Sequence, residues 1–259
     1  MKRLTMFVCC VLLPFLAVSQ NRGESPRQHI TFGIKGGVNL ASMRFTDWHL
    51  GDLPQKMVLR PVGGLFVDLP VLNWLSIAPE LMYVERGMET VYTHYSGYEV
   101  DYAIRSRYVD FRLPLLLGIN VTSWLQPYLV VGGDVGYLLG GEIQLKQTGL
   151  PNPELSVDLG KANMKPLYLG AFGGLGLRFF YHLNGQRAHV KVEATYHREF
   201  LDTFSEMEHN DLAHPENMNA YNITGKRFPQ GIEFTLGVTL PLIPGERDAC
   251  YNFSRNKWR

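Results

Sequence analysis

Large apolar residues alternate with polar or small residues along many segments of this chain. In residues 108–119 every odd position is large and apolar, whereas the even positions include Asp110, Arg112, Pro114 and Gly118. A period of two residues fits a β-strand and no helix. The segment therefore predicts a strand with one apolar face and one charged face.

Eight segments share this alternation, and the lengths of the connections between them alternate as well. The predicted strands are 30–40, 58–69, 75–88, 108–119, 126–139, 165–180, 188–200 and 230–241; the long connections are 41–57, 89–102, 140–164 and 201–226. Outer-membrane barrels have an even number of antiparallel strands, short periplasmic turns and long external loops. A soluble β-sandwich explains the period but not the alternating connections. We therefore expect an all-β fold: an eight-stranded antiparallel up-and-down transmembrane β-barrel.

Charged residues on the predicted inward faces are balanced in sign. The interior of an eight-stranded barrel is only just wide enough for side chains, and an unpaired buried charge is costly. We therefore expect these charges to pair inside the barrel, and Glu80 to pair with Arg112 because their strands are adjacent. The solvated outer face of a soluble protein would require no such balance. The six basic and six acidic residues are Lys35, Arg60, Arg86, Arg112, Arg178 and Lys191, and Asp68, Glu80, Asp110, Asp134, Glu193 and Glu233.

Aromatic residues beside the predicted short turns favour an outer surface that faces lipid. Transmembrane barrels carry girdles of aromatic residues where the apolar band meets the membrane interface. The candidates for a girdle at the periplasmic rim are Trp74, Trp124, Phe179, Phe180 and Tyr181.

Glycines and prolines recur inside the predicted strands. Adjacent glycines suit the bends and close packing of a small barrel, and because none begins a helix they do not predict a phosphate-binding loop. A proline removes one hydrogen bond from a ladder, so we expect a strand end or a bulge at each one. The glycine pairs begin at Gly36, Gly63, Gly132 and Gly173, and the prolines are Pro61, Pro79, Pro114 and Pro166.

The amino terminus has the pattern of a secretory signal. Lys2 and Arg3 precede an apolar run over residues 4–16, and Ala17-Val18-Ser19 provides small residues for cleavage. The run is shorter than the roughly 20 residues that a membrane-spanning helix needs. We expect a removed signal peptide over residues 1–19, a short lead over 20–29, the barrel over 30–241 and a polar periplasmic tail over 242–259.

Charge and cysteine content argue against a nucleic-acid-binding protein and against a protein held together by intrachain disulfides. Loss of Lys2 and Arg3 from 25 basic residues leaves 23 against 24 acidic residues. A chain this close to neutrality is not expected to bind nucleic acid. Of the three cysteines only Cys250 lies outside the signal, so the exported chain can form no intrachain disulfide.

Four segments carry a resemblance to a known family. They are residues 32–40 (FGIKGGVNL), 77–81 (IAPEL), 108–116 (YVDFRLPLL) and 127–133 (PYLVVGG). In these segments the chain resembles the PorT-like outer-membrane β-barrel family. The resemblance implies an eight-stranded barrel in the outer membrane of a Gram-negative bacterium, and the name-giving member is linked to type IX protein secretion. Such barrels often end at an aromatic residue of the last strand, whereas this chain continues over residues 242–259.

The sequence offers little chemistry for catalysis. His197 is the only histidine well inside a predicted strand on its inward face, and no serine lies beside it, so we interpret it as a polar lumen residue. His209, Asp211 and His214 have side chains that bind metals, but acidic loops with histidine are usually solvated. We therefore expect no catalytic residue, no cofactor and no metal site.

Three functions remain open. The leading hypothesis is a non-enzymatic outer-membrane barrel that acts as a structural or protein-interaction component, in protein secretion if the resemblance extends to function. Its expected partners are outer-membrane lipid, lipopolysaccharide, and proteins that contact the external loops or the tail. The alternatives are a lipid-modifying barrel enzyme and a narrow channel. The channel is disfavoured because the interior of an eight-stranded barrel leaves no open bore.

Overall fold

The computed structural model describes residues 30–45, 55–93, 99–147, 154–159, 165–183, 186–201 and 227–241. Within these residues no helix is long and apolar enough to span a membrane. The strands are β1 Thr31–Phe45, β2 Gln55–Lys56, β3 Val58–Leu72, β4 Leu75–Ile77, β5 Glu80–Thr93, β6 Glu99–Gly118, β7 Leu125–Gln147, β8 Glu154–Asp158, β9 Leu167–Leu183, β10 Gln186–Glu199 and β11 Arg227–Pro241.

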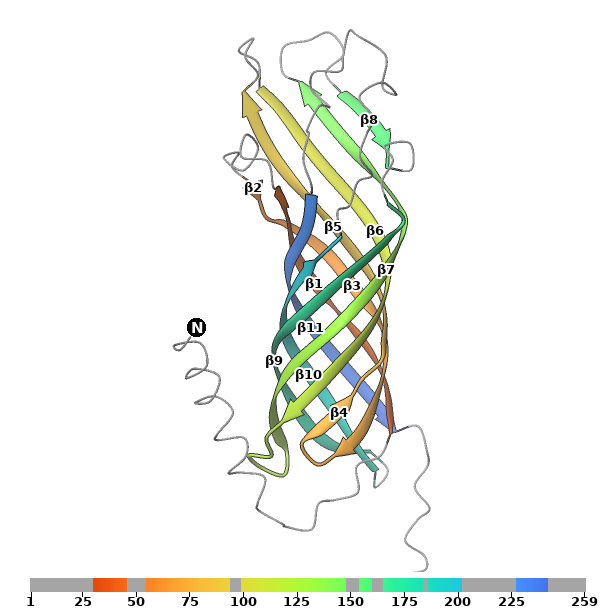
Figure 1. The fold of residues 1–259 in the computed structure, drawn as a ribbon. Coiled ribbons are helices and arrows are strands. Elements are labelled where there is room, and N and C mark those ends of the chain that lie inside the picture. The colour runs from red at the N-terminus through yellow and green to blue at the C-terminus, as the bar shows by residue number, and fades with distance from the viewer. Residues whose placement is uncertain are drawn as a thin grey trace, which may run out of the picture.

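Nine of these strands close into one antiparallel ring (Figure 1). The ring closes where β1 pairs with β11 on one side and with β3 on the other. Strands β4 and β5 lie one after the other between β3 and β6 and together take the place of a single strand. The nine strands therefore form a barrel wall of eight strand positions. The short strands β2 and β8 extend the sheet beside β5 and β7. The predicted eight-stranded antiparallel barrel is therefore confirmed.

The ring has two different ends. Short connections join its strands at the end near β4, which we call the turn side, and the opposite end, which we call the loop side, carries β2 and β8 (Figure 1). Thr31 pairs with Pro241 at the turn side, so the first and last strands of the barrel begin and end together there.

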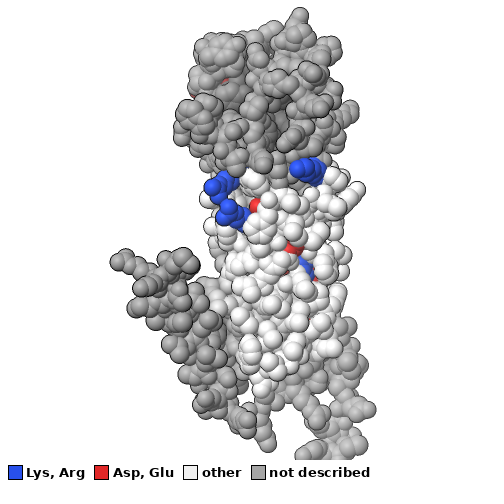
Figure 2. Space-filling view, viewed as in Figure 1, with Lys and Arg blue, Asp and Glu red and all other residues white. Residues whose placement is uncertain are grey.

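Side chains alternate between the outer surface and the interior. On β6, Phe111 and Leu113 are 55% and 48% exposed, whereas Asp110 and Arg112 are 0% and 2% exposed. An apolar outer face around a polar interior is the pattern of a transmembrane barrel and the reverse of a soluble one. In the space-filling view most of the described wall is free of charge, and Lys and Arg side chains gather at its upper margin (Figure 2).

The strands reach further on the loop side than the sequence predicted. Strands β6 and β7 contain 20 and 23 residues, and β5 continues to Thr93, so much of the predicted connections 89–102 and 140–164 is strand. Beyond the apolar band both faces of a strand can be polar, so the alternation that revealed the strands fades there. Of the predicted connection 41–57, residues 41–45 belong to β1 and residues 55–56 form β2. Residues 46–54 and 202–226 lie outside the described residues.

Prolines mark an interruption of the wall. Pro79 lies in the gap between β4 and β5, and Pro114 of β6 faces this gap, where its carbonyl accepts the N–H of Ala78 at 3.0 Å. Pro166 immediately precedes β9, and Pro61 lies just beyond the last pair of the β3–β5 ladder. The expected strand ends are found at Pro79 and Pro166, whereas Pro61 and Pro114 lie inside β3 and β6, within continuous ladders to β1 and β7.

Two inward glycines leave room for aromatic rings. A Cβ on Gly136 would lie 1.7 Å from the Tyr168 ring, and a Cβ on Gly33 would lie 2.4 Å from the Phe66 ring. In a lumen only as wide as its side chains, such rings fit only where the facing wall residue has none. These two glycines therefore allow the Tyr168 and Phe66 rings to pack directly against the backbone of the wall.

We predict that Gly136→Ala destabilises the barrel, because its methyl group would overlap the Tyr168 ring. Overpacking of this kind costs about 1–3 kcal/mol of unfolding free energy. Gly133→Ala, on the same strand, is the matched control, because a Cβ there has only an ordinary contact at 3.7 Å with the Gly170 carbonyl oxygen. Urea unfolding in lipid vesicles measures both, and equal stability of the two variants would contradict the packing argument.

Candidate functional site

The barrel lumen contains most of the charged residues singled out from the sequence. Eleven of the twelve are buried in the structure. The exception is Arg60, which lies at the loop-side end of β3 and donates to the exposed Glu89 at 3.4 Å. The buried ones are Lys35, Asp68, Glu80, Arg86, Asp110, Arg112, Asp134, Arg178, Lys191, Glu193 and Glu233.

The expected balance of six basic against six acidic residues is wrong. Glu199 is also buried inside the ring, because β10 places it in the inward row that contains Glu193 and His197. With Glu199 added and Arg60 removed, five basic and seven acidic side chains are buried on the described inward faces of the ring. Glu199 was not among the predicted inward residues, because it stands at the end of the predicted strand 188–200.

A turn-side cluster surrounds Asp68. Its carboxylate accepts a hydrogen bond from Arg178 at 2.7 Å. The His189 Nε2 atom lies 3.3 Å from the same carboxylate, and the Lys191 Nζ atom lies 4.0 Å from it. Arg178 also donates to Gln126 at 2.9 Å. One carboxylate therefore serves several basic groups at this end of the barrel.

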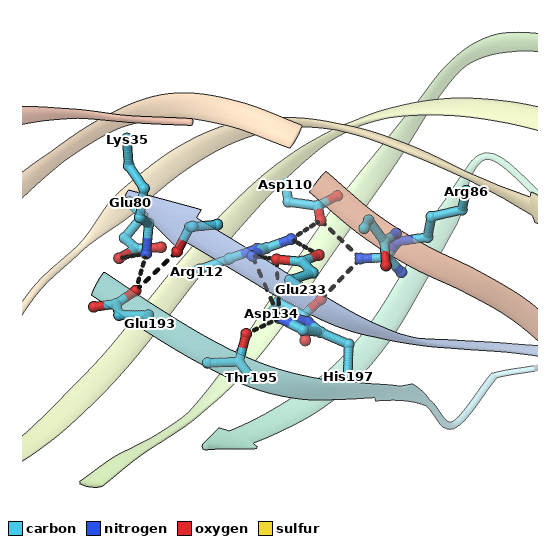
Figure 3. Close-up of polar contacts among 12 residues, drawn as sticks. Lys35, Glu80, Arg86, Asp110, Arg112, Asp134, Glu193, Thr195, His197 and Glu233 are labelled. Carbon is cyan, nitrogen blue, oxygen red and sulfur yellow. Dashed lines mark hydrogen bonds and ion pairs between the residues drawn. The ribbon is translucent and has the colours of Figure 1, made fainter. Parts of the chain in front are cut away.

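A central cluster surrounds Lys35. Its ammonium donates to Glu80 at 2.5 Å and to Glu193 at 2.7 Å (Figure 3). Tyr128 donates to Glu193 at 2.7 Å, and the Lys191 Nζ atom lies 3.7 Å from that carboxylate. Lys191 thus lies between the central cluster and the turn-side cluster.

A loop-side cluster is built on two arginines. Arg112 of β6 crosses the lumen to β11, where it donates twice to Glu233, at 2.6 and 2.9 Å (Figure 3). It also donates to Asp110 at 3.1 Å. Two parallel bonds between a guanidinium and a carboxylate are among the strongest polar contacts in proteins.

Arg86 is the second arginine of the loop-side cluster. It donates to Asp110 at 2.8 Å and to Tyr168 at 2.5 Å. It also bonds Glu199, and lies 3.5 Å from Asp134. Asp110 therefore joins the two arginines, since each donates to the same oxygen.

The predicted pair between Glu80 and Arg112 is wrong. These residues are direct neighbours across β5 and β6, but Glu80 binds Lys35 and Arg112 binds Glu233. Long side chains in a narrow ring reach the opposite wall as easily as the next strand, so adjacency in the ladder does not decide the partner.

Apolar and aromatic side chains fill the space between the charged clusters. The alternation along the strands predicts which side chains point inward, Tyr128 among them, but it does not predict these contacts. Two groups of inward residues in contact are Ala78, Leu116, Tyr128, Val130 and Phe172, and Val62, Met82 and Val84. The lumen is thus packed with side chains, so it does not provide an open bore.

The rim aromatics divide between the two sides of the wall. Trp74 and Trp124 are exposed outside, and the Trp124 ring stacks on Phe179 with 6.3 Å between centroids. Phe180 instead lines a pocket inside the turn-side mouth together with Arg178. Phe180 was expected in the outer aromatic girdle, but it points inward. Side chains on a strand alternate between the two faces, so Phe180 lies on the same inward face as Arg178.

The surroundings of His197 do not form a catalytic triad. Thr195 Oγ1 and a Glu233 oxygen both lie 3.3 Å from the same ring nitrogen, Nε2, and Nδ1 has no hydrogen-bond partner in the described structure. A triad needs the nucleophile and the acid on opposite ring nitrogens. Among the residues that the structure describes, no group of three His, Cys, Asp or Glu side chains is arranged for a metal ion.

The apolar outer wall, the closed ring and the charge-filled lumen define a transmembrane β-barrel. Residues 18–205 match the family described as "Outer membrane protein beta-barrel domain". The chain belongs to this family, and it is therefore a protein of the Gram-negative outer membrane.

Solved structures of other outer-membrane proteins are similar at low identity. Ail of Yersinia pestis is 12% identical, with 83% of this chain and 100% of that chain covered and a TM-score of 0.38. Neisserial surface protein A is 10% identical (82% and 100% covered, TM-score 0.39). OprG of Pseudomonas aeruginosa is 11% identical (83% and 98% covered, TM-score 0.40). No curated protein matches the chain.

We predict that Glu80 is energetically coupled to Lys35 more strongly than to Arg112. Removing one partner of a buried pair costs roughly 3–5 kcal/mol, because the other charge is left unpaired. In double-mutant cycles of unfolding free energy, Lys35→Met with Glu80→Gln should show a coupling energy at least about 1 kcal/mol larger than Arg112→Gln with Glu80→Gln. A larger coupling in the second cycle would restore the pairing expected from the ladder.

Proposed function

We propose that this protein is a non-enzymatic outer-membrane barrel that acts as a structural or protein-interaction component. The observation that carries the proposal is that strands of the barrel continue beyond the apolar band as a folded sheet. A transmembrane strand needs about 9–11 residues, whereas β6 and β7 contain 20 and 23. We call residues 99–107, 140–147 and 154–159 the loop-side extension.

The loop-side extension has apolar packing of its own. Tyr102, Ile104, Ile143 and Leu159 are buried there, and the Leu159 N–H donates to the Gly141 carbonyl at 3.0 Å. Its outer surface presents polar and charged side chains, among them Asp101, Arg107, Gln144, Lys146 and Ser156. A rigid sheet that projects from the membrane with a polar surface suits the binding of another protein.

The packed lumen supports this proposal over its two alternatives. A channel needs a continuous path, and the central and loop-side clusters occupy the interior with paired charges and rings. A lipid-modifying enzyme needs an activated nucleophile, and the buried His197 has its contacts on one ring nitrogen. The resemblance to the PorT-like family makes protein secretion the process that we favour for the interaction.

The proposed topology follows from the two ends of the ring. Short turns of outer-membrane barrels face the periplasm, so the loop-side extension is extracellular and both chain termini are periplasmic. In this proposal residues 1–19 direct export and are removed, and residues 242–259 form a periplasmic tail.

Basic side chains at the loop-side margin of the band fit lipopolysaccharide as a lipid partner. Arg44 of β1 and Arg198 of β10 are exposed on the two strands that flank β11. Figure 2 shows Lys and Arg at the upper margin of the uncharged band on the face that it displays. Phosphate groups of the outer leaflet would lie at this level.

We predict that a photo-crosslinking residue at position 144 captures a protein in intact cells, because Gln144 is exposed on the loop-side extension. The matched control is position 135 on the same strand, where the exposed Val135 lies in the apolar band and should yield lipid adducts only. Equal protein capture at both positions, or none at position 144, would contradict the interaction role. Altered lipid A in a deletion strain without any captured protein would favour the enzyme instead.

We predict that Arg44→Gln combined with Arg198→Gln weakens the binding of purified lipopolysaccharide. Each basic residue near an anionic membrane surface contributes about 1 kcal/mol, so the dissociation constant should rise roughly tenfold or more. Lys146→Gln is the control, because Lys146 lies seven residues beyond Leu139, an exposed apolar residue of β7. If Lys146→Gln weakens binding as much, for each charge removed, as the double variant of Arg44 and Arg198 does, lipopolysaccharide does not bind at the loop-side margin of the apolar band.

A further inference from the structure

A small pocket opens at the turn-side mouth, at the opposite end of the barrel from the loop-side extension. Its lining includes Thr31 of β1, Asp68 of β3, and Arg178, Phe180, Arg187 and His189 of the β9–β10 hairpin. The proposed function uses none of these residues, and only Asp68, Arg178 and Phe180 were singled out from the sequence.

Basic groups outnumber acidic groups in this pocket. Asp68 is the only carboxylate among the described lining residues, and it already accepts a hydrogen bond from Arg178 at 2.7 Å. Arg187 adds a second guanidinium to the lining, and Lys191 approaches Asp68 from the barrel side at 4.0 Å. The charge of Asp68 therefore does not neutralise its basic neighbours, and the pocket favours an anion.

Arg187 is held in place while keeping hydrogen-bond donors available. Its guanidinium carbon lies 3.6 Å from the centroid of the Phe180 ring. In the described structure it donates one hydrogen bond, to the Ser123 carbonyl oxygen at 2.9 Å, and it lies within ion-pair distance of no described carboxylate. A guanidinium has five N–H donors in a planar fork that matches carboxylate and phosphate oxygens.

Thr31 supplies an unused polar group on the same pocket. Its side chain is 3% exposed, and its hydroxyl oxygen has no hydrogen-bond partner among the described residues. A buried hydroxyl without a partner is costly, and most such groups in proteins are satisfied. An acceptor bound in the pocket would satisfy it.

We propose that the turn-side pocket binds one oxyanion group, a carboxylate or a phosphate, that enters from the periplasm. Arg187 is its principal contact, through the N–H groups that the Ser123 carbonyl leaves unused, and the Thr31 hydroxyl is a second donor. Phe180 holds the guanidinium at the mouth. The hydrogen bond from Arg178 keeps Asp68 from competing with the ligand for Arg187.

Titration calorimetry on the full-length protein in lipid nanodiscs tests this site, with inorganic phosphate and acetate as probes at constant ionic strength. We expect saturable binding of at least one probe. Arg187→Gln and Thr31→Val should each raise the dissociation constant, by about tenfold for the loss of a charge-assisted bond, and Arg187→Lys should restore part of the affinity. Thr31→Val should not lower the unfolding midpoint, because it removes a hydroxyl that has no partner.

Lys56→Gln is the control, because it removes one positive charge from an exposed residue of β2 at the loop side, away from both proposed anion contacts. Binding of phosphate alone identifies a phosphate group as the ligand, and binding of acetate alone identifies a carboxylate. Absence of saturable binding of either probe overturns the proposal, as does unchanged affinity in both Arg187→Gln and Thr31→Val. Equal weakening by Lys56→Gln would also overturn it, since attraction to any cation would then explain the binding. If Arg187→Gln does not fold, Arg187→Lys and Thr31→Val decide the matter.

Discussion

The pairing of charge inside a ring of eight positions is the constraint on which the rest of this structure depends. Lipid surrounds the wall, so the polar groups of the strands must point inward, where there is room only for side chains. The two hydrogen bonds from Arg112 to Glu233 join β6 to β11 across the lumen, and Lys35 joins β1 to β5 and β10. These contacts connect strands that are not neighbours in the ladder. The interior is consequently a packed core, and any contact with a partner must be made at the surface.

The aromatic rings and glycines of the wall follow from the same constraint. Guanidinium groups lie against rings in the lumen, as Arg86 does with Tyr168 at 4.3 Å from its carbon atom to the ring centroid. Such contacts fill space that water would otherwise occupy and leave the pairing of the charge intact. The Tyr168 ring fits because position 136 has no side chain. Charge pairs, rings and glycines therefore form one packing arrangement, and a change in any of them disturbs the others.

The alternation along the chain was enough to predict the ring and the faces of its strands, because one side of every strand meets lipid. It could not predict the partners within the lumen. Glu80 and Arg112 are neighbours in the ladder but bind residues on other strands, and side-chain length and position in the folded ring decide this. The loop-side extension escaped prediction because the alternation fades beyond the lipid. The pocket at the turn-side mouth was not predicted, because Thr31 of β1 meets Phe180 and Arg187 of the β9–β10 hairpin only when the ring closes.

The distribution of contacts in the lumen also limits how the two ends of the barrel can influence each other. Lys191 lies between Asp68 and Glu193, so the turn-side and central clusters form one electrostatic network. The loop-side cluster has its own carboxylates, and Phe172, which lies 5.9 Å from Arg112 and stacks on His197, belongs to the apolar packing below it. An anion at the turn-side mouth would thus change the charge pairing as far as Lys35. The arginine pairs beneath the loop-side extension keep their partners, so binding at one end need not alter the surface at the other.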